Sequence, residues 1–376
     1  MPTLDVLFIS GDIGGNVPPT IAIARELAAR THRVTIAGLA PRAGDAWADG
    51  IETVPIRALD GLDVTRPAGP TGHAPSLRRM ALGREVGREV RALIAEHPAD
   101  VVVVDGTMLG SIRESVRADR PTAALFHTFG AFWSRGLGNV AVNAALRPFG
   151  LAPRRLLGEV DALLLPTDPE LDPAGGTSTG FAFDWLGITE AGSPPAPRSP
   201  DAPSLVLVSL SSAWQRGQGD VYRRLIAALG ELADDPGVRA VVTTGGADVD
   251  GELAPPPNVE IRGRAPHAEI MPHADLVIGH GGHSTTMRAL AHGLPILVLP
   301  LDPTSDQRMT GAVVERAGIG RALPRDAPVE TLRDTIAAML ADSALRARAA
   351  DTGERLRGQH GASHGADRVE AIAGAR

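Results

Sequence analysis

The chain has 376 residues, the length of two domains of ordinary size, each able to bury its own core. Its 43% apolar and 22% charged residues are typical of a globular protein, and the absence of cysteine excludes disulfides, cysteine nucleophiles and cysteine-ligated metals. All 37 basic side chains are arginine, which excludes a lysine Schiff base and a P-loop lysine, and a net charge of −7 disfavours nucleic acid as a partner.

The beginning of the chain carries no basic segment before its first apolar run at residues 4–9. The other apolar runs are far shorter than the roughly 18 residues that a membrane span needs. We therefore expect a cytoplasmic protein without a membrane partner.

In the first half, short runs rich in β-branched residues alternate with stretches of helical period, which is typical of a parallel α/β sheet. Strands are predicted at residues 4–9, 33–36 and 101–104, and a helix at 20–30. Two irregular segments, 66–75 and 129–138, are predicted to be loops. Such loops either cover a binding site or are plain surface connections.

The second half repeats this alternation. The predicted strands are 205–208, 240–243, 276–278 and 296–299, and the predicted helices are 221–232, 285–292 and 307–317. A proline-rich stretch separates the halves, so we predict a first domain at 1–190, an extended linker at 191–203 and a second domain at 204–376. The tail at 341–357 is predicted to be helical and the last dozen residues to be frayed, although the last helix has the alternative of packing on the first domain.

Open parallel sheets bind ligands beyond the carboxyl ends of their strands, so the residues that follow each strand are the candidates for a site. A glycine-rich turn at 11–15 follows the first strand and permits either close approach of a ligand or tight packing. Asp105 ends a strand of valines and is either a site carboxylate or a helix cap.

The strongest signal is the segment 280–286, which follows an apolar strand and opens a helix with two glycines and several hydroxyls. Free backbone N–H groups and the helix dipole at such a terminus favour an anion such as phosphate, to which His280 adds a ring N–H. The alternative is a capped helix with a buried histidine. A metal site is disfavoured because no histidine pair has the i, i+4 spacing with a nearby acid, and no dinucleotide fingerprint supports a dehydrogenase. The histidines considered for the metal are His273, His280, His283 and His292.

Residues 272–286, followed by 289–295, Leu299-Pro300, Asp306-Gln307 and 317–320, resemble the donor-binding signature of the family 1 glycosyltransferases. The resemblance implies the GT-B fold, in which two Rossmann-like domains face each other across a cleft. It also implies a nucleotide diphosphate sugar as donor and a small-molecule acceptor. The cysteine- and lysine-free composition resembles actinobacterial proteins, which suggests an aromatic or polyketide natural product as acceptor.

The resemblance assigns the donor-side residues to the second domain. His280, with its neighbours Gly281, Gly282 and His283, matches the histidine segment that contacts the diphosphate. Ser284, Thr285 and Ser212 match hydroxyl and backbone donors to the phosphates; Arg264, Ala265 and His267 match the segment that holds the base; and Asp306 and Gln307 match the pair that binds sugar hydroxyls. No metal and no further cofactor is implied.

Two positions depart from the family pattern. Arg288 stands where many members have a glutamate that binds ribose hydroxyls, which favours a dTDP-sugar over a UDP-sugar. Asn16 stands where the family has its catalytic histidine, whereas Asp105 matches the aspartate that orients that histidine. Because an amide cannot take a proton, either the acceptor needs little help, or Asp105 or Asp12 is the base while Asn16 positions the acceptor, or the protein binds sugar nucleotides without turnover.

We therefore expect an inverting, metal-independent glycosyltransferase of the hexosyltransferase type, which forms a β-glycoside from an α-linked donor. The alternatives are a nucleotide-sugar epimerase of the same fold and a non-catalytic helper that binds nucleotide sugars. His127, which follows the strand-like residues 123–126, is a further candidate histidine on the acceptor side, with a purely structural histidine as the alternative. A homodimer is left open.

Overall fold

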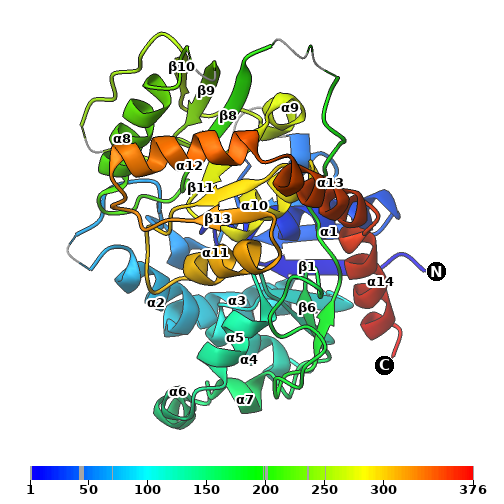
Figure 1. The fold of residues 1–376 in the computed structure, drawn as a ribbon. Coiled ribbons are helices and arrows are strands. Elements are labelled where there is room, and N and C mark those ends of the chain that lie inside the picture. The colour runs from blue at the N-terminus through cyan, green and yellow to red at the C-terminus, as the bar shows by residue number, and fades with distance from the viewer. Residues whose placement is uncertain are drawn as a thin grey trace. The chain divides into compact units, whose positions relative to one another are not determined.

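The computed structural model describes residues 2–41, 46–69, 71–197, 199, 202–234, 237–249 and 251–375. It divides into two compact units, which are described separately here (Figure 1). Unit 1 comprises Met1–Asp63, His73–Thr189 and His360–Arg376, and unit 2 comprises Val64–Gly72 and Glu190–Gln359. The predicted boundary after residue 190 leaves residues 64–72 in the first domain, whereas they belong to unit 2. Residues 360–376 belong to unit 1, where the alternative given for the last helix places them.

Unit 1 is built on a seven-stranded sheet with the order β3-β2-β1-β4-β5-β6-β7, in which all neighbours pair in parallel. Its strands are β1 (Asp5–Ile9), β2 (Arg33–Ala37), β3 (Glu52–Val54), β4 (Val101–Asp105), β5 (Thr122–Leu125), β6 (Ala162–Leu165) and β7 (Phe183–Trp185). The sheet is buried on both faces, because Val102 and Val104 belong to one core and Val101 and Val103 to another. The strands predicted at 4–9, 33–36 and 101–104 are confirmed as β1, β2 and β4, whereas β3, β6 and β7 were not predicted.

Helices of unit 1 pack on these two cores, α3 and α4 on one and α1 and α14 on the other. They are α1 (Val17–Ala29), α2 (Ala74–Leu82), α3 (Arg84–Glu96), α4 (Leu109–Arg117), α5 (Gly130–Leu137), α6 (Val140–Leu146), α7 (Pro153–Leu156) and α14 (Gly361–Ala373), with the 3-10 helices η1 (Ala46–Ala48), η2 (Arg57–Leu59) and η3 (Arg147–Phe149).

The prediction of a loop at 129–138 is wrong, because α5 occupies most of it. The N-terminus of α5 is capped from a distance: the Asp172 carboxylate accepts the N–H groups of Gly130 at 2.7 Å and Ala131 at 3.1 Å. A cap supplied from 42 residues away leaves no local signal in the sequence.

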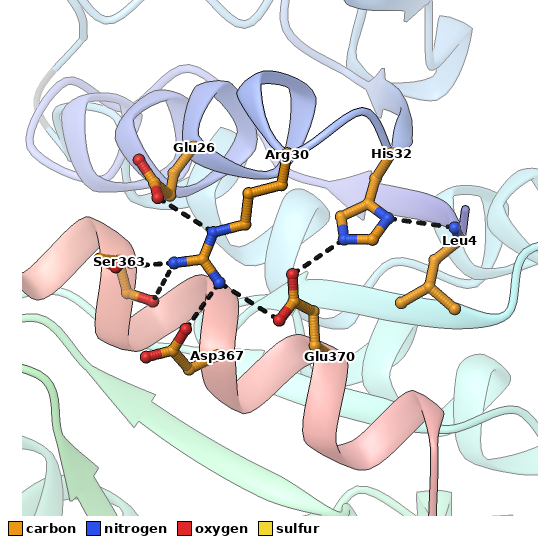
Figure 2. A network of polar contacts seen from close by, with 7 residues as sticks. All are labelled: Leu4, Glu26, Arg30, His32, Ser363, Asp367 and Glu370. Atoms are coloured by element: carbon orange, nitrogen blue, oxygen red, sulfur yellow. Dashed lines mark hydrogen bonds and ion pairs between the residues drawn. The ribbon is translucent and has the colours of Figure 1, made fainter. Parts of the chain in front are cut away.

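The prediction that the last dozen residues are frayed is wrong, because α14 packs against α1 (Figure 2). This packing corresponds to the alternative given for the last helix. The Arg30 guanidinium donates to Asp367 Oδ1 at 2.6 Å and to Glu370 Oε2 at 3.2 Å, and Glu370 Oε1 lies 2.9 Å from His32 Nε2. Burial opposes the charge on Glu370, but the hydrogen bonds from His32 and Arg30 outweigh it and hold the pKa of this carboxyl below its usual range. These polar contacts anchor the last helix to unit 1.

Unit 2 is built on a six-stranded parallel sheet with the order β10-β9-β8-β11-β12-β13. Its strands are β8 (Ser204–Ser209), β9 (Val238–Thr243), β10 (Val259–Arg262), β11 (Leu276–Gly279), β12 (Ile296–Val298) and β13 (Gly320–Ala322), and its helices are α8 (Gln218–Gly230), α9 (His267–Ile270), η4 (Met271–His273), α10 (His283–Ala291), α11 (Gln307–Arg316), α12 (Val329–Ala341) and α13 (Ser343–Arg357). The four predicted strands and the predicted tail helix are confirmed, whereas β10 and β13 were not predicted.

Two connecting segments pack along unit 2. Residues 198, 200 and 201 of the predicted linker lie outside the described residues, but earlier in it the Ser193 N–H donates to His292 Nδ1 at 3.1 Å. The second segment, residues 64–72, is hydrogen bonded to the loops that follow β8 and β9. The Val64 carbonyl accepts the Trp214 N–H at 2.7 Å, and the Thr65 carbonyl accepts the Asp248 N–H at 3.0 Å.

Candidate functional site

The first candidate site of unit 1 lies in the loop between β1 and α1, where Asn16 is 2% exposed. Its Nδ2 donates to Asp105 Oδ2 at 2.5 Å, to the Gly11 carbonyl at 2.7 Å and to Ser10 Oγ at 3.1 Å. Its Oδ1 accepts the N–H of Ile13 at 3.3 Å. Both ends of the amide are therefore hydrogen bonded within the protein, and an amide offers no site for a proton at neutral pH.

Asp105, the last residue of β4, is 4% exposed and surrounded by donors. Its Oδ1 accepts the Thr107 N–H at 2.8 Å and the Thr107 hydroxyl at 2.5 Å, and its Oδ2 accepts from Asn16 and, at 3.5 Å, from the Ser10 hydroxyl. These contacts use both oxygens to hold the loop. The geometry suits a positioning carboxylate better than a base that must reach a bound acceptor.

Two further candidates lie at the same edge of the sheet. Asp12 is partly exposed in the loop before Asn16, and its Oδ1 accepts the Gly14 N–H at 3.2 Å. His127 comes two residues after Leu125, the residue of β5 that pairs with Asp105.

The backbone beside His127 is strained. Thr128 has a φ of 64°, a left-handed conformation that is costly for a β-branched residue. Within the described part of the chain the Nδ1 of His127 is buried and lacks a hydrogen-bond partner, and its carbonyl accepts the indole N–H of Trp133. Strain of this kind is concentrated at functional sites in proteins. From sequence alone, His127 was a candidate only because it follows a strand-like segment.

The second candidate site is the N-terminus of α10 in unit 2, which follows β11 after a turn of two glycines. Gly281 has a φ of 90°, and a Cβ there would lie 2.7 Å from the carbonyl oxygen of Gln307. A Cβ on Gly282 would lie 2.6 Å from the ring of His280. Both glycines are therefore required for the close approach of this turn to its surroundings.

His280 lies directly before this turn. Burial lowers the pKa of the His280 ring to about 4, so the imidazole is neutral at pH 7. Among the described residues its buried Nδ1 has no hydrogen-bond partner. A buried nitrogen without a partner at the start of a helix is suited to a ligand that brings its own hydrogen bond.

The first turn of α10 contains the other predicted phosphate-binding residues. His283 is 8% exposed, and Ser284 and Thr285 are partly exposed. The first three N–H groups of a helix have no partner within the helix, so this terminus is an anion site on general grounds.

Two other predicted residues, Ser212 and Arg264, both lie against the loop that follows β9. Gly245 and Gly246 have φ values of 65° and 81°. A Cβ on Gly245 would lie 3.0 Å from the Cα of Ser212, and one on Gly246 would lie 2.8 Å from the Nε of Arg264. This glycine pair was missed, although the sequence carries its signal directly after the predicted strand at 240–243.

His267 opens α9 and lies within the same group of residues. Burial, together with the smaller effect of the positive charge of Arg288 on α10, lowers the pKa of His267 to about 4. Its Nε2 is 3.4 Å from the Thr243 hydroxyl. Ala265, two residues earlier, is partly exposed. The positive charge of Arg288 therefore acts on His267 in the predicted base-binding segment.

The predicted sugar-binding residues Asp306 and Gln307 lie at the N-terminus of α11 and differ in burial. Gln307 is 4% exposed, and its Oε1 accepts the N–H groups of Leu301 at 2.6 Å and Asp302 at 2.9 Å. Asp306 is the N-cap residue of α11 and is partly exposed. The carbonyl end of Gln307 therefore shapes the preceding loop, and Asp306 is the more accessible of the two side chains.

No group of three histidine or acidic side chains suited to a metal ion occurs in the described ranges of the chain. Nor does any helix in those ranges have the length and apolar character needed to cross a bilayer.

Comparisons with known proteins agree with this architecture. Residues 224–363 match the family model described as "Erythromycin biosynthesis protein CIII-like, C-terminal domain". The demethyllactenocin mycarosyltransferase of Streptomyces fradiae is 34% identical over 151 residues, which are 40% of this chain and 31% of that protein. The alignment thus spans about a third of the length of this curated relative.

Two solved structures cover nearly the whole chain. The kitacinnamycin glycotransferase covers 99% of this chain and 100% of its own, with a TM-score of 0.77 and 23% identity. The spinosyn rhamnosyltransferase SpnG, complexed with thymidine diphosphate, covers 96% and 98%, with a TM-score of 0.69 and 21% identity. The GT-B fold is therefore confirmed. Together with the match of residues 224–363 to the erythromycin CIII-like family, it confirms the resemblance to family 1 glycosyltransferases of the actinobacterial natural-product type.

Proposed function

We propose that this protein is an inverting glycosyltransferase that moves a sugar from a nucleotide diphosphate sugar to a small-molecule acceptor. The observation that carries the proposal is the N-terminus of α10, where His280 has a buried ring nitrogen beside a two-glycine turn. The similarity to the mycarosyltransferase supports the same reaction class.

In the proposed reaction the acceptor atom bonds to the anomeric carbon as the bond from that carbon to the diphosphate oxygen breaks. Negative charge then develops on the leaving diphosphate. The helix dipole and the N–H groups of the first turn of α10, the hydroxyls of Ser284 and Thr285 and the ring of His280 are proposed to stabilise that charge. Since the His280 ring is neutral at pH 7, it contributes a hydrogen bond and not a positive charge.

The nucleoside is proposed to lie against the loops after β9 and β10. Arg264 is exposed there, and its planar guanidinium suits stacking on a pyrimidine, while Ala265 offers its backbone to the base edge. The charge of Arg288 acts on this region, where a carboxylate that binds ribose hydroxyls would otherwise be expected. This arrangement favours a dTDP-sugar over a UDP-sugar, as does the thymidine diphosphate bound to the structurally similar SpnG.

Deprotonation of the acceptor is proposed to proceed without a histidine at position 16, where this chain has Asn16. Asn16 and Asp105 bind each other and the loop, which leaves the partly exposed Asp12 as the carboxylate best placed to receive the acceptor's proton. An acceptor that loses its proton readily, such as an acidic phenol, fits this arrangement because it needs little general-base assistance.

The proposal is tested by release of nucleoside diphosphate from dTDP- and UDP-sugars, with and without a panel of phenolic and polyketide acceptors, in the presence of EDTA. Release that depends on an acceptor, with formation of a β-glycoside, is the expected result. Conversion of the donor without acceptor would instead indicate an epimerase. Tight binding without turnover on any acceptor would indicate a non-catalytic helper.

A further inference from the structure

Exposed apolar side chains are concentrated on one part of unit 1. The large hydrophobic residues that are exposed in the described part of the chain are Val140 at 79%, Val142 at 38% and Phe149 at 53%. All three lie on α6 and on η3, which contacts it, and α6 also contacts α5 in unit 1 (Figure 1). Clustered apolar exposure of this kind marks an interaction surface.

Helix α6 is held firmly while its apolar side is uncovered. Its sequence, Val-Ala-Val-Asn-Ala-Ala-Leu, contains one polar side chain and no charge. That side chain, Asn143, donates to the carbonyls of Leu137 at 2.6 Å and Asn139 at 2.9 Å, and accepts the Arg154 N–H at 2.9 Å. The Asn139 side chain caps the helix through the N–H groups of Ala141 and Val142. The exposed valines are therefore part of an ordered helix and not of a frayed segment.

The same region is strongly basic. Residues 126–158 contain four arginines and neither aspartate nor glutamate, although the whole chain has a net charge of −7. Arg155 is paired with Glu159 at 3.0 Å, which leaves Arg135, Arg147 and Arg154 as the arginines nearest α6 in sequence. Arg135 and Arg147 are exposed on either side of α6. A hollow of about 510 Å³ joins Phe149 to Arg78 and Arg84, which extends the basic character onto α2 and α3.

We propose that the α6 surface, defined as Val140, Val142, Phe149, Arg135 and Arg147, docks on an anionic membrane surface. An exposed apolar helix flanked by arginines has the composition of segments that lie in the bilayer interface, where the apolar side enters the headgroup region and the arginines meet anionic lipids. A second copy of the chain is a poorer partner, because it would bring the same arginines against each other.

This proposal departs from the sequence-based expectation of no membrane partner, which considered only spanning segments. A surface-bound helix needs no run of 18 apolar residues, and α6 has seven. The proposal is independent of the proposed transferase activity, because it rests on residues outside both candidate sites.

The test is sedimentation of the full chain with phosphatidylcholine vesicles that contain or lack phosphatidylglycerol. We expect binding only to the anionic vesicles, and weaker binding as salt is raised. At about fivefold per arginine, Arg135→Gln with Arg147→Gln should lower the partition coefficient about 25-fold. Val140→Gln with Val142→Gln should lower it at least about tenfold.

The matched control is Arg25→Gln with Arg88→Gln, two exposed arginines of unit 1 on α1 and α3. This pair should leave vesicle binding unchanged, and circular dichroism should show every variant folded. Absence of binding to anionic vesicles would overturn the proposal, as would an equal loss in the control pair. A dimer in vesicle-free solution that the valine changes abolish would assign the surface to a second copy of the chain instead.

Discussion

Replacement of Asp105 by asparagine tests the buried contact between β4 and the loop after β1. In the wild type one carboxylate oxygen accepts two donors from Thr107 and the other accepts the Asn16 amide, with the Ser10 hydroxyl at 3.5 Å. In the variant an NH2 group replaces one of these oxygens. Either the Thr107 donors or the Asn16 amide then face an N–H donor and lose their acceptor. Hydrogen bonds to a charged group are each worth about 1.5–3 kcal/mol, and we expect a loss of about 3 kcal/mol in the stability of unit 1.

Thermal unfolding followed by circular dichroism or calorimetry measures this loss. At about 2–4 °C per kcal/mol, the expected fall in Tm of unit 1 is about 6–12 °C. Asp100→Asn is the matched control, because this carboxylate is exposed just before β4 and accepts one N–H, from Asp5 at 2.8 Å. Nucleotide binding should persist in Asp105→Asn, since the donor-side residues belong to unit 2. A Tm equal to that of the wild type would refute the reasoning.

Three other predictions concern α10 and α14. His280→Ala should weaken nucleoside diphosphate binding about 10- to 100-fold by calorimetry, through loss of a hydrogen bond to a charged ligand, and unchanged affinity would remove His280 from the phosphate site. Gly282→Ala should weaken the same binding, because the new Cβ displaces the His280 ring. Gly358→Ala is the control and should leave the affinity unchanged, because a Cβ there meets no atom closer than 3.4 Å. Equal affinities of the two variants would show that the ring tolerates displacement. Glu370→Gln should cost about 1–2 kcal/mol at pH 7 in chemical denaturation. Because the folded-state pKa of Glu370 is lowered, its stabilisation is present above the unfolded-state pKa near 4.3 and is lost as the pH falls through the folded-state pKa. A difference between wild type and variant that persists at pH 2 would contradict this ion-pair account.

The central strands could be predicted because burial on both faces requires apolar residues throughout. The four valines of β4 are each at most 1% exposed, and their run stands out in the sequence. The short outer strands carry no such run. Helix α5 was missed because its cap comes from Asp172. The choice between a frayed end and a packed last helix could not be made from sequence, because Arg30 and His32, more than 300 positions earlier, supply the polar partners of α14.

The candidate site was predictable to a similar degree. The α10 signal depends on residues that are adjacent in sequence, so it could be located directly. The pairing of Asn16 with Asp105 was implied only by the family resemblance, because 89 residues separate the two. The hydrogen bonds from Thr107 to Asp105 and from residues 301 and 302 to Gln307 depend on side-chain orientations. A sequence pattern does not encode these orientations.

The central claim is that α10 and the loops beside it bind a pyrimidine nucleoside diphosphate. Calorimetric titration of the full chain with dTDP, UDP and GDP in EDTA tests it most directly. We predict metal-free binding of a pyrimidine diphosphate, dTDP more tightly than UDP, with GDP much weaker than either. Absence of binding by all three nucleotides would contradict the account.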